Sequence, residues 1–188
     1  MAGLIPQDDA RVDIQLLLAE FYDAANQFSQ LGKCEATDAP PEPYNKLLNH
    51  HAHMTVTVES HHQDSVDVVV HRHHRHQDQG HDWYSREITL KTHRSGKVVQ
   101  YGIVRLDVNT LAPQVWGEIE SRQIPLGRVL IQHNVLREVQ LCGLWKFSAG
   151  PQLATHLACQ EGDTLFGRTA LIYCDGEPAI ELLEIVAQ

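Results

Sequence analysis

The stretch "DWYSREITLKTHRSGKVVQYGIVRLDV" (82–108) decides the fold class, because apolar and polar residues alternate along it on both sides of a Ser-Gly turn at 95–96. The alternation predicts two antiparallel strands. Two later stretches, "VLREVQLCGLWKF" (135–147) and "FGRTALIYCDGEPAIELLEIVA" (166–187), predict a further strand and a second hairpin around a Cys-Asp-Gly-Glu turn. Successive hairpins without a regular strand-helix-strand order indicate an α+β domain built on a single antiparallel sheet.

The rest of the chain supplies helices and two more strands to one predicted domain, 1–188. Residues 9–28 place apolar side chains at helical spacing, with Asp8 or Asp9 as the cap. Shorter helices are expected over 42–50, over 111–122 from near Pro113, and after the turn in "IPLGRVLIQHN" (124–134). The alternating stretches "MTVTVES" (54–60) and "DSVDVVVHR" (64–72) predict strands.

Composition excludes several classes of protein. The chain has 188 residues, 43% of them hydrophobic, and a formal net charge of −9, which argues against a general nucleic-acid binder. No stretch has the length and apolar character of a membrane span or a signal peptide. The four cysteines have no C-x-x-C spacing, so free thiols are expected. They are Cys34, Cys142, Cys159 and Cys174. These features predict a soluble, cytoplasmic protein.

Histidine is concentrated in "VHRHHRH" (70–76). On a strand, His71 and His73 would face one way, and His74 and His76 the other. A metal site needs several converging ligands, and this run alone offers at most two on either face. The run is therefore interpreted as an exposed strand end, and no metal or cofactor is expected.

Three other features carry more specific chemistry. Arg86 shares the apolar face of its strand with Ile88 and Leu90, so it is expected either to pair with a carboxylate from the protein or from a ligand, or to reach the rim of the sheet. In "PAIELLEIVA" (178–187), Glu181 and Glu184 fall on opposite faces, both otherwise apolar, and burial of either would suit proton transfer. Gly127, after Pro125, would let a helix start approach an anion closely.

Taken together, five stretches resemble the chorismate pyruvate-lyase superfamily, and the chorismate lyase-like family formerly of unknown function in particular. They are "LLNHHAHMTVTVE" (47–59), "YSREITL" (84–90), "VVQYGIVRLDVNTL" (98–111), "IPLGRVLI" (124–131) and "GRTALIYCDGEPAIELLEI" (167–185). The family-like region runs from about 44 to 187. The resemblance implies an antiparallel sheet with helices on one face and an internal cavity closed by helical flaps. It also implies cofactor-free conversion of chorismate to pyruvate and a hydroxybenzoate, expected to be 4-hydroxybenzoate.

The resemblance also assigns roles to individual residues. Arg86 would bind the substrate carboxylate, and Glu184 would bind the hydroxyl and assist proton transfer, so both are expected to be catalytic. Met54, Leu126 and Gly127 would line the pocket. The family's spacing from proline to glutamate is one residue shorter than here, which leaves Glu181 as an alternative. The expected partners are chorismate and its aromatic product, with neither nucleic acid nor membrane.

Two other classes of function remain open. The same fold serves as a sensor in the effector domains of some bacterial transcription regulators, so the chain is alternatively a non-catalytic domain that binds an aromatic acid. The sensor interpretation receives less weight, because only one helix and a loop are expected before the family-like region. A metal-handling protein built on the histidine run is the third possibility.

Overall fold

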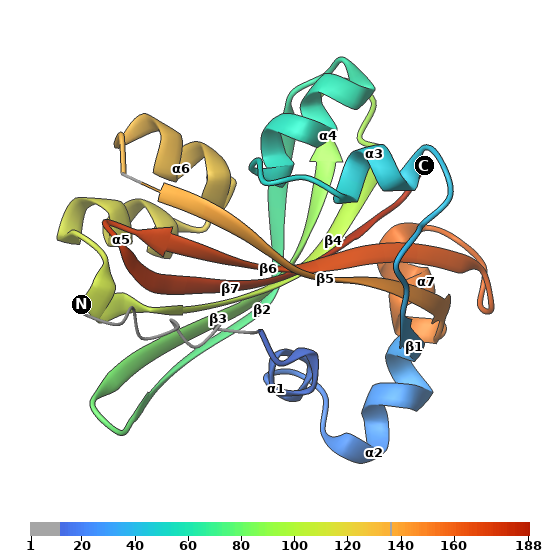
Figure 1. The fold of residues 1–188 in the computed structure, drawn as a ribbon, viewed down its shortest axis with the longest axis horizontal. Coiled ribbons are helices and arrows are strands. Elements are labelled where there is room, and N and C mark those ends of the chain that lie inside the picture. Colours follow the sequence, from blue (N-terminus) through green and yellow to red (C-terminus); the bar gives the residue numbers. More distant parts are fainter. Residues whose placement is uncertain (1–11, 136) are drawn as a thin grey trace, which may run out of the picture.

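The computed structural model describes residues 12–135 and 137–188 and centres on one antiparallel sheet (Figure 1). Its seven strands lie in the order β1-β5-β6-β7-β4-β3-β2. Every neighbouring pair is antiparallel. The strands are β1 (Gly32–Ala36), β2 (Val66–Asp78), β3 (His81–Thr92), β4 (Val98–Asp107), β5 (Arg137–Ala149), β6 (Thr164–Cys174) and β7 (Glu177–Val186). The predicted α+β class and single antiparallel sheet are confirmed.

Helices cover both faces of this sheet, as Figure 1 shows. The resemblance implied one covered face, but both faces are apolar, so each has to be shielded from water. One face carries α1 (Ile14–Ala19), α2 (Ala24–Asn26), a π-helical turn (Gln27–Leu31) and α7 (Pro151–Leu157). The opposite face carries α3 (Tyr44–Leu48), α4 (Met54–His62), α5 (Pro113–Ser121) and α6 (Leu126–Gln132), and a 3-10 turn (Val108–Thr110) follows β4.

Two sequence predictions are wrong in local structure. Residues 54–60 form helix α4 and not a strand, because Met54, Thr55 and Val58 are buried at helical spacing while Val56 is exposed. The long N-terminal helix is also interrupted. Its described part stops at Ala19, and a new turn starts after Asp23, whose side chain accepts a hydrogen bond from the Asn26 amide. Asp8 and Asp9 lie outside the described residues, and Asp13 caps α1.

The histidine run does lie on a strand, but a β-bulge changes its facing. The register of β2 against β3 shifts between Val70 and Arg72. His71 therefore contacts Thr89 and His156 on the α7 face. His73 instead contacts the guanidinium of Arg122 on the opposite face. The prediction that His71 and His73 share a face is wrong, because an extra residue in a strand reverses the alternation beyond it.

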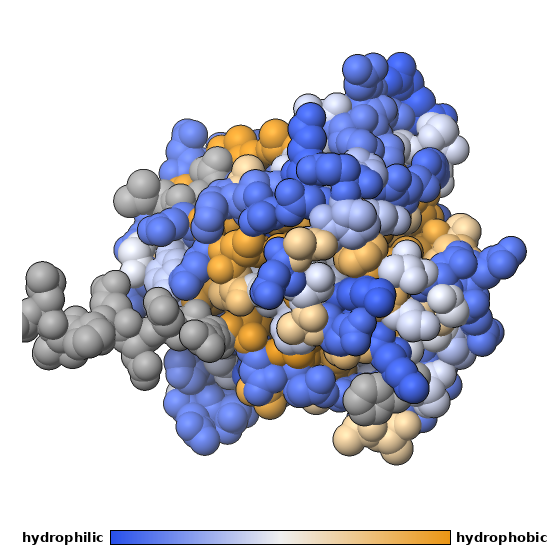
Figure 2. Space-filling model, turned by 45° about the vertical axis from the view of Figure 1, so that its right-hand side comes forward, coloured by the Kyte–Doolittle hydropathy of each residue, from blue (hydrophilic) through white to orange (hydrophobic). Residues whose placement is uncertain are grey.

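The surface is mostly hydrophilic on the side drawn in Figure 2, with apolar residues in a band between the polar ones. None of the helices in the described part of the chain is long and apolar enough to cross a membrane.

Candidate functional site

A cavity lies between the sheet and the helices α4 and α6. Its floor comes from β3, β4, β6 and β7, whose inward residues share one face. Its walls are mainly apolar, with a few polar groups among them, which is typical of small-molecule sites. The lining residues are His53, Met54, Thr55, Arg86, Ile88, Leu90, Gln100, Gly102, Val104, Pro125, Leu126, Gly127, Val139, Arg168, Ile172, Leu182, Leu183 and Glu184.

All five residues expected at the site from the sequence line this one cavity. They are Met54, Arg86, Leu126, Gly127 and Glu184. The sheet register explains part of this, because Gly102 on β4 is paired with Ile88 on β3 and with Glu184 on β7. Arg86 lies one inward position further along β3, opposite Val104. Arg86 and Glu184, which are about a hundred positions apart in the chain, therefore face the same space.

Arg86 is fully buried, and none of its three guanidinium nitrogens has a hydrogen-bond partner within the described part of the protein. Burial lowers the pKa of Arg86, yet a guanidinium stays protonated in proteins. An unpaired buried charge is strongly unfavourable. The neighbouring Tyr84 opposes this pKa shift in part, but the cavity still holds a cation that has no hydrogen-bonded partner among the described residues.

Arg168, the second fully buried arginine of the cavity, has a complete set of partners. Its Nε donates to Glu184 Oε2 at 2.7 Å. Its other nitrogens donate to the carbonyl oxygens of His50 (2.9 Å) and Ala52 (3.0 Å). Glu184 thus enters the cavity as one half of a buried ion pair, and not as the isolated carboxyl group that the sequence suggested.

The strand alternation also separates the two glutamates of β7. Glu184 lines the cavity, whereas Glu181 lies on the opposite face and accepts a hydrogen bond from Arg105 at 3.2 Å. Burial raises the pKa of Glu181, and Arg105 opposes this shift. Glu184 is therefore the β7 carboxylate available to a ligand in the cavity.

Sequence reasoning missed Arg168 and Gln100. Arg168 stands among apolar residues in "LFGRTALI" (165–172), so the rule that singled out Arg86 applied to it equally. Gln100 is buried, and its side-chain oxygen has no partner among the described residues. The sequence feature that could have identified Gln100 is its position two residues before Gly102, on the inward face of β4. The cavity thus offers an unpaired donor group at Arg86 and an unpaired acceptor at Gln100.

The covering helices meet closely above the cavity. A Cβ atom added at Gly127 of α6 would lie 2.9 Å from Thr55 Oγ1 of α4. The predicted close approach at Gly127 therefore exists, but it is an approach of helix to helix. An ion pair between Arg128 and Glu59 also joins α6 to α4.

The cavity is small in this conformation. The centre of a water molecule can occupy about 30 Å³ of it, which is room for roughly two or three waters. A ring-sized ligand would need a wider cavity than this conformation provides.

No protein-family model matches the chain, and no curated protein matches it in sequence. Solved structures do match. PhnF from Mycobacterium smegmatis is 12% identical, with 72% of this chain and 63% of that chain covered and a TM-score of 0.52. The effector domain of PhnF is likewise 12% identical, with 72% and 87% covered and a TM-score of 0.51. A structure described as the ligand-binding domain of a GntR-family transcriptional regulator from Bordetella bronchiseptica is 13% identical, with 65% and 86% covered and a TM-score of 0.49.

These comparisons show the fold. The chain has a chorismate lyase-like α+β fold, which it shares with the effector domain of PhnF. It spans less than two thirds of PhnF and matches the effector domain over most of that domain's length. The fold that the resemblance implied is supported, whereas no sequence match supports membership of the chorismate lyase-like family itself.

Proposed function

We propose that this chain is a binding domain for a small aromatic carboxylate, with Arg86 as the residue that holds the carboxylate. The observation that carries the proposal is the fully buried guanidinium without a partner in the described chain. A carboxylate would accept two parallel hydrogen bonds from it and neutralise its charge. The effector domains with the same fold support a role in binding.

The other residues of the cavity indicate which chemical groups the ligand would carry besides its carboxylate. Ile88, Leu90, Val104, Leu126 and Leu182 provide apolar walls suited to a ring. Arg168 and Glu184 stand on β6 and β7, whereas Arg86 stands on β3 beyond β4. A hydroxyl group at the end of the ring away from the carboxylate would therefore lie near the Glu184 acceptor. Gln100 offers its amide oxygen to a second donor group.

Titration calorimetry with 4-hydroxybenzoate tests this proposal. Arg86→Met should weaken binding by about 10- to 100-fold, because a charge-assisted hydrogen bond contributes about 1.5–3 kcal/mol. The matched control is Arg94→Met, which removes an exposed arginine at the β3–β4 turn and should leave affinity unchanged. Equal affinities for wild type and Arg86→Met would overturn the assignment of Arg86. Benzoate and 3-hydroxybenzoate, compared in the same way, report on the hydroxyl contact.

A second candidate function is a chorismate lyase, favoured by the carboxylate of Glu184 in the same cavity as Arg86. The elimination breaks the bond from the ring carbon to the enolpyruvyl oxygen and removes a ring proton. The products are 4-hydroxybenzoate and pyruvate, and aromatisation drives the reaction. Arg86 would orient the ring carboxylate, and Glu184 would hold the hydroxyl and assist proton transfer.

Mixing the purified protein with chorismate and EDTA separates the two functions. Release of pyruvate and hydroxybenzoate that is lost in Glu184→Gln would establish the lyase. Binding of 4-hydroxybenzoate without any turnover of chorismate would leave the binding domain as the function. If the protein neither binds 4-hydroxybenzoate nor converts chorismate, both proposed functions are wrong, and its likeness to chorismate lyase concerns the fold alone.

A further inference from the structure

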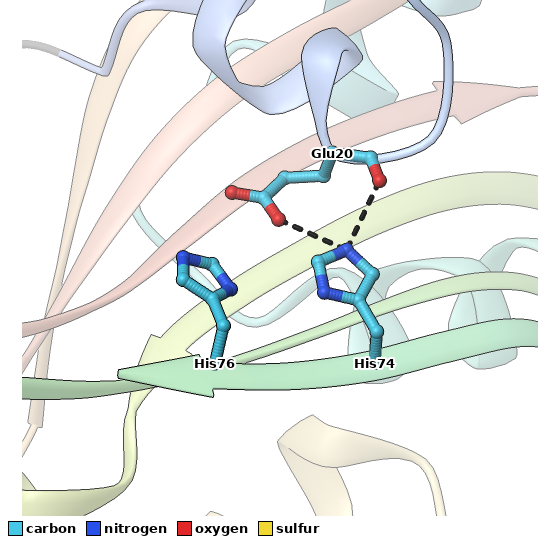
Figure 3. A group of neighbouring side chains, drawn as sticks. All are labelled: Glu20, His74 and His76. Atoms are coloured by element: carbon cyan, nitrogen blue, oxygen red, sulfur yellow. Dashed lines mark hydrogen bonds and ion pairs between the residues drawn. The ribbon is translucent and has the colours of Figure 1, made fainter. Parts of the chain in front are cut away.

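The histidine run meets a carboxylate from the N-terminal part of the chain. Glu20, the residue that ends α1, faces His74 and His76 of β2 (Figure 3). One potential ligand atom from each residue lies within 4.8 Å of the other two. A site that seemed limited to two ligands on one strand face therefore has a third, contributed from more than fifty residues earlier in the chain.

His74 and His76 lie close together on the same face of β2. They are two residues apart on a regular part of β2, beyond the β-bulge, so they share a face. Their rings stack, with centroids 5.7 Å apart. His76 is exposed and the His74 side chain is 38% exposed, which leaves water access to the cluster.

The Glu20 carboxylate is fixed by the surrounding residues. Arg105 Nε lies 3.1 Å from Oε1, while Ser85 Oγ donates to Oε2 at 2.9 Å. His74 Nε2 lies 3.1 Å from the same Oε2 and 3.0 Å from the Glu20 carbonyl oxygen. Such supporting contacts orient a carboxylate before an ion arrives, which is how metal ligands are held in proteins.

The neighbouring arginines are largely neutralised by carboxylates of their own. Arg72 pairs with Glu87, and Arg75 pairs with Asp82. Arg105, which touches Glu20, also pairs with Glu181. The positive charge of the run is therefore offset locally, in a chain whose formal net charge is −9.

We propose that Glu20, His74 and His76 bind one divalent transition-metal ion, with Zn²⁺ as the best fit. Two imidazoles and one carboxylate are ligands that Zn²⁺ takes readily, and solvent would complete a four-coordinate shell. Mg²⁺ and Ca²⁺ prefer oxygen ligands and fit this set poorly. The ion would replace the contact between His74 Nε2 and the Glu20 carboxylate, and it would join the end of α1 to the β2–β3 hairpin.

Native mass spectrometry and titration calorimetry with ZnCl₂ on the untagged, EDTA-treated full chain test this site. Wild type should retain one Zn²⁺ per chain, and His74→Ala/His76→Ala should bind at least about 10-fold more weakly. The matched control is His61→Ala/His62→Ala, because these histidines are adjacent on α4 and lie outside the cluster. Its affinity should equal that of wild type.

Thermal unfolding provides a readout that is specific to the folded site. Zn²⁺ should raise the Tm of wild type and of His61→Ala/His62→Ala, because an ion that binds only the folded state stabilises it. It should not raise the Tm of His74→Ala/His76→Ala, nor that of Glu20→Gln. Equal weakening in both histidine pairs, or no retained ion in wild type, would overturn the proposal and leave only non-specific binding to surface histidines.

Discussion

Arg86 and Glu87 are neighbours in the chain, both fully buried, and they face opposite sides of the sheet. Glu87 accepts hydrogen bonds from Tyr101 (2.7 Å), Arg72 (2.7 Å) and Tyr22. Arg86 has no such partner within the described residues. Both side chains are inaccessible to solvent, so the difference lies in the partners that the surrounding fold supplies. We therefore interpret the Glu87 face as structural, and the unsatisfied charge of Arg86 is the basis for proposing that the other face binds a ligand.

Among the substitutions that test this difference between the two faces, Arg168→Met should have the largest effect on stability. It leaves Glu184 buried without its cation and removes the donors to two carbonyl oxygens. We expect the free energy of unfolding to fall by about 3–5 kcal/mol, measured by urea denaturation. The control Arg94→Met removes only an exposed ion pair with Asp64 and a hydrogen bond to the Gln63 carbonyl oxygen, so it should change the free energy of unfolding by less than about 1 kcal/mol. A loss below about 1 kcal/mol for Arg168→Met would show that the pair is not the main structural contact of the cavity.

Glu87→Gln should destabilise the protein by about 1–3 kcal/mol at neutral pH, because it weakens a charged acceptor with three donors. Burial alone would raise the pKa of Glu87, but the hydrogen bonds from Arg72, Tyr22 and Tyr101 outweigh it and lower the pKa. A lowered folded-state pKa stabilises the protein above the unfolded value, near 4.3, and this contribution disappears as the pH falls through the folded value.

The pH dependence of Glu87→Gln therefore has a defined sign. The difference in unfolding free energy between wild type and Glu87→Gln should be largest near neutral pH and should shrink as the pH drops below about 4. Glu161→Gln, an exposed substitution on the turn before β6, is the control and should show no such trend. A difference that grows on acidification would mean that the folded state raises the pKa of Glu87.

Gly127→Ala should cost about 1–3 kcal/mol of stability, because the new methyl group would press on Thr55 across the α4–α6 contact. Gly117→Ala on α5, where nothing lies within 4 Å of the added atom, is the matched control. It should be neutral or slightly stabilising. If both substitutions behave alike in denaturation, the two covering helices are less tightly packed than the structure indicates.

Arg86→Met should have the smallest effect on stability, and any change should be stabilising, unlike the changes caused by the other substitutions. It removes a buried charge that has no described partner, so the free energy of unfolding should stay within about 1 kcal/mol of wild type or rise. Urea denaturation without ligand measures this. A loss as large as that of Arg168→Met would mean that Arg86 is already satisfied within the protein, and the contrast between the two arginines would fail.

Several parts of the structure followed from local pattern. The β3–β4 and β6–β7 hairpins were predictable because strict alternation and turn residues act over short distances. Helix α4 was not, because its "MTVTV" stretch alternates in sequence although tertiary packing makes it helical. The five expected cavity residues lie together, but the partner of Glu184 was missed, since Arg168 and Glu184 meet only through the pairing of β6 with β7.

The sequence by itself determined the antiparallel α+β class, the placement of Arg86 on an apolar face, and the placement of His74 and His76 on a common face. These depend on periodicity along single strands. Only the tertiary structure decided which buried charges have partners. It gave Arg168 a glutamate, left Arg86 open to the cavity, and brought Glu20 to the two histidines. The physical reason is that charge pairing depends on contacts between distant segments, which strand order and register create and local sequence does not encode.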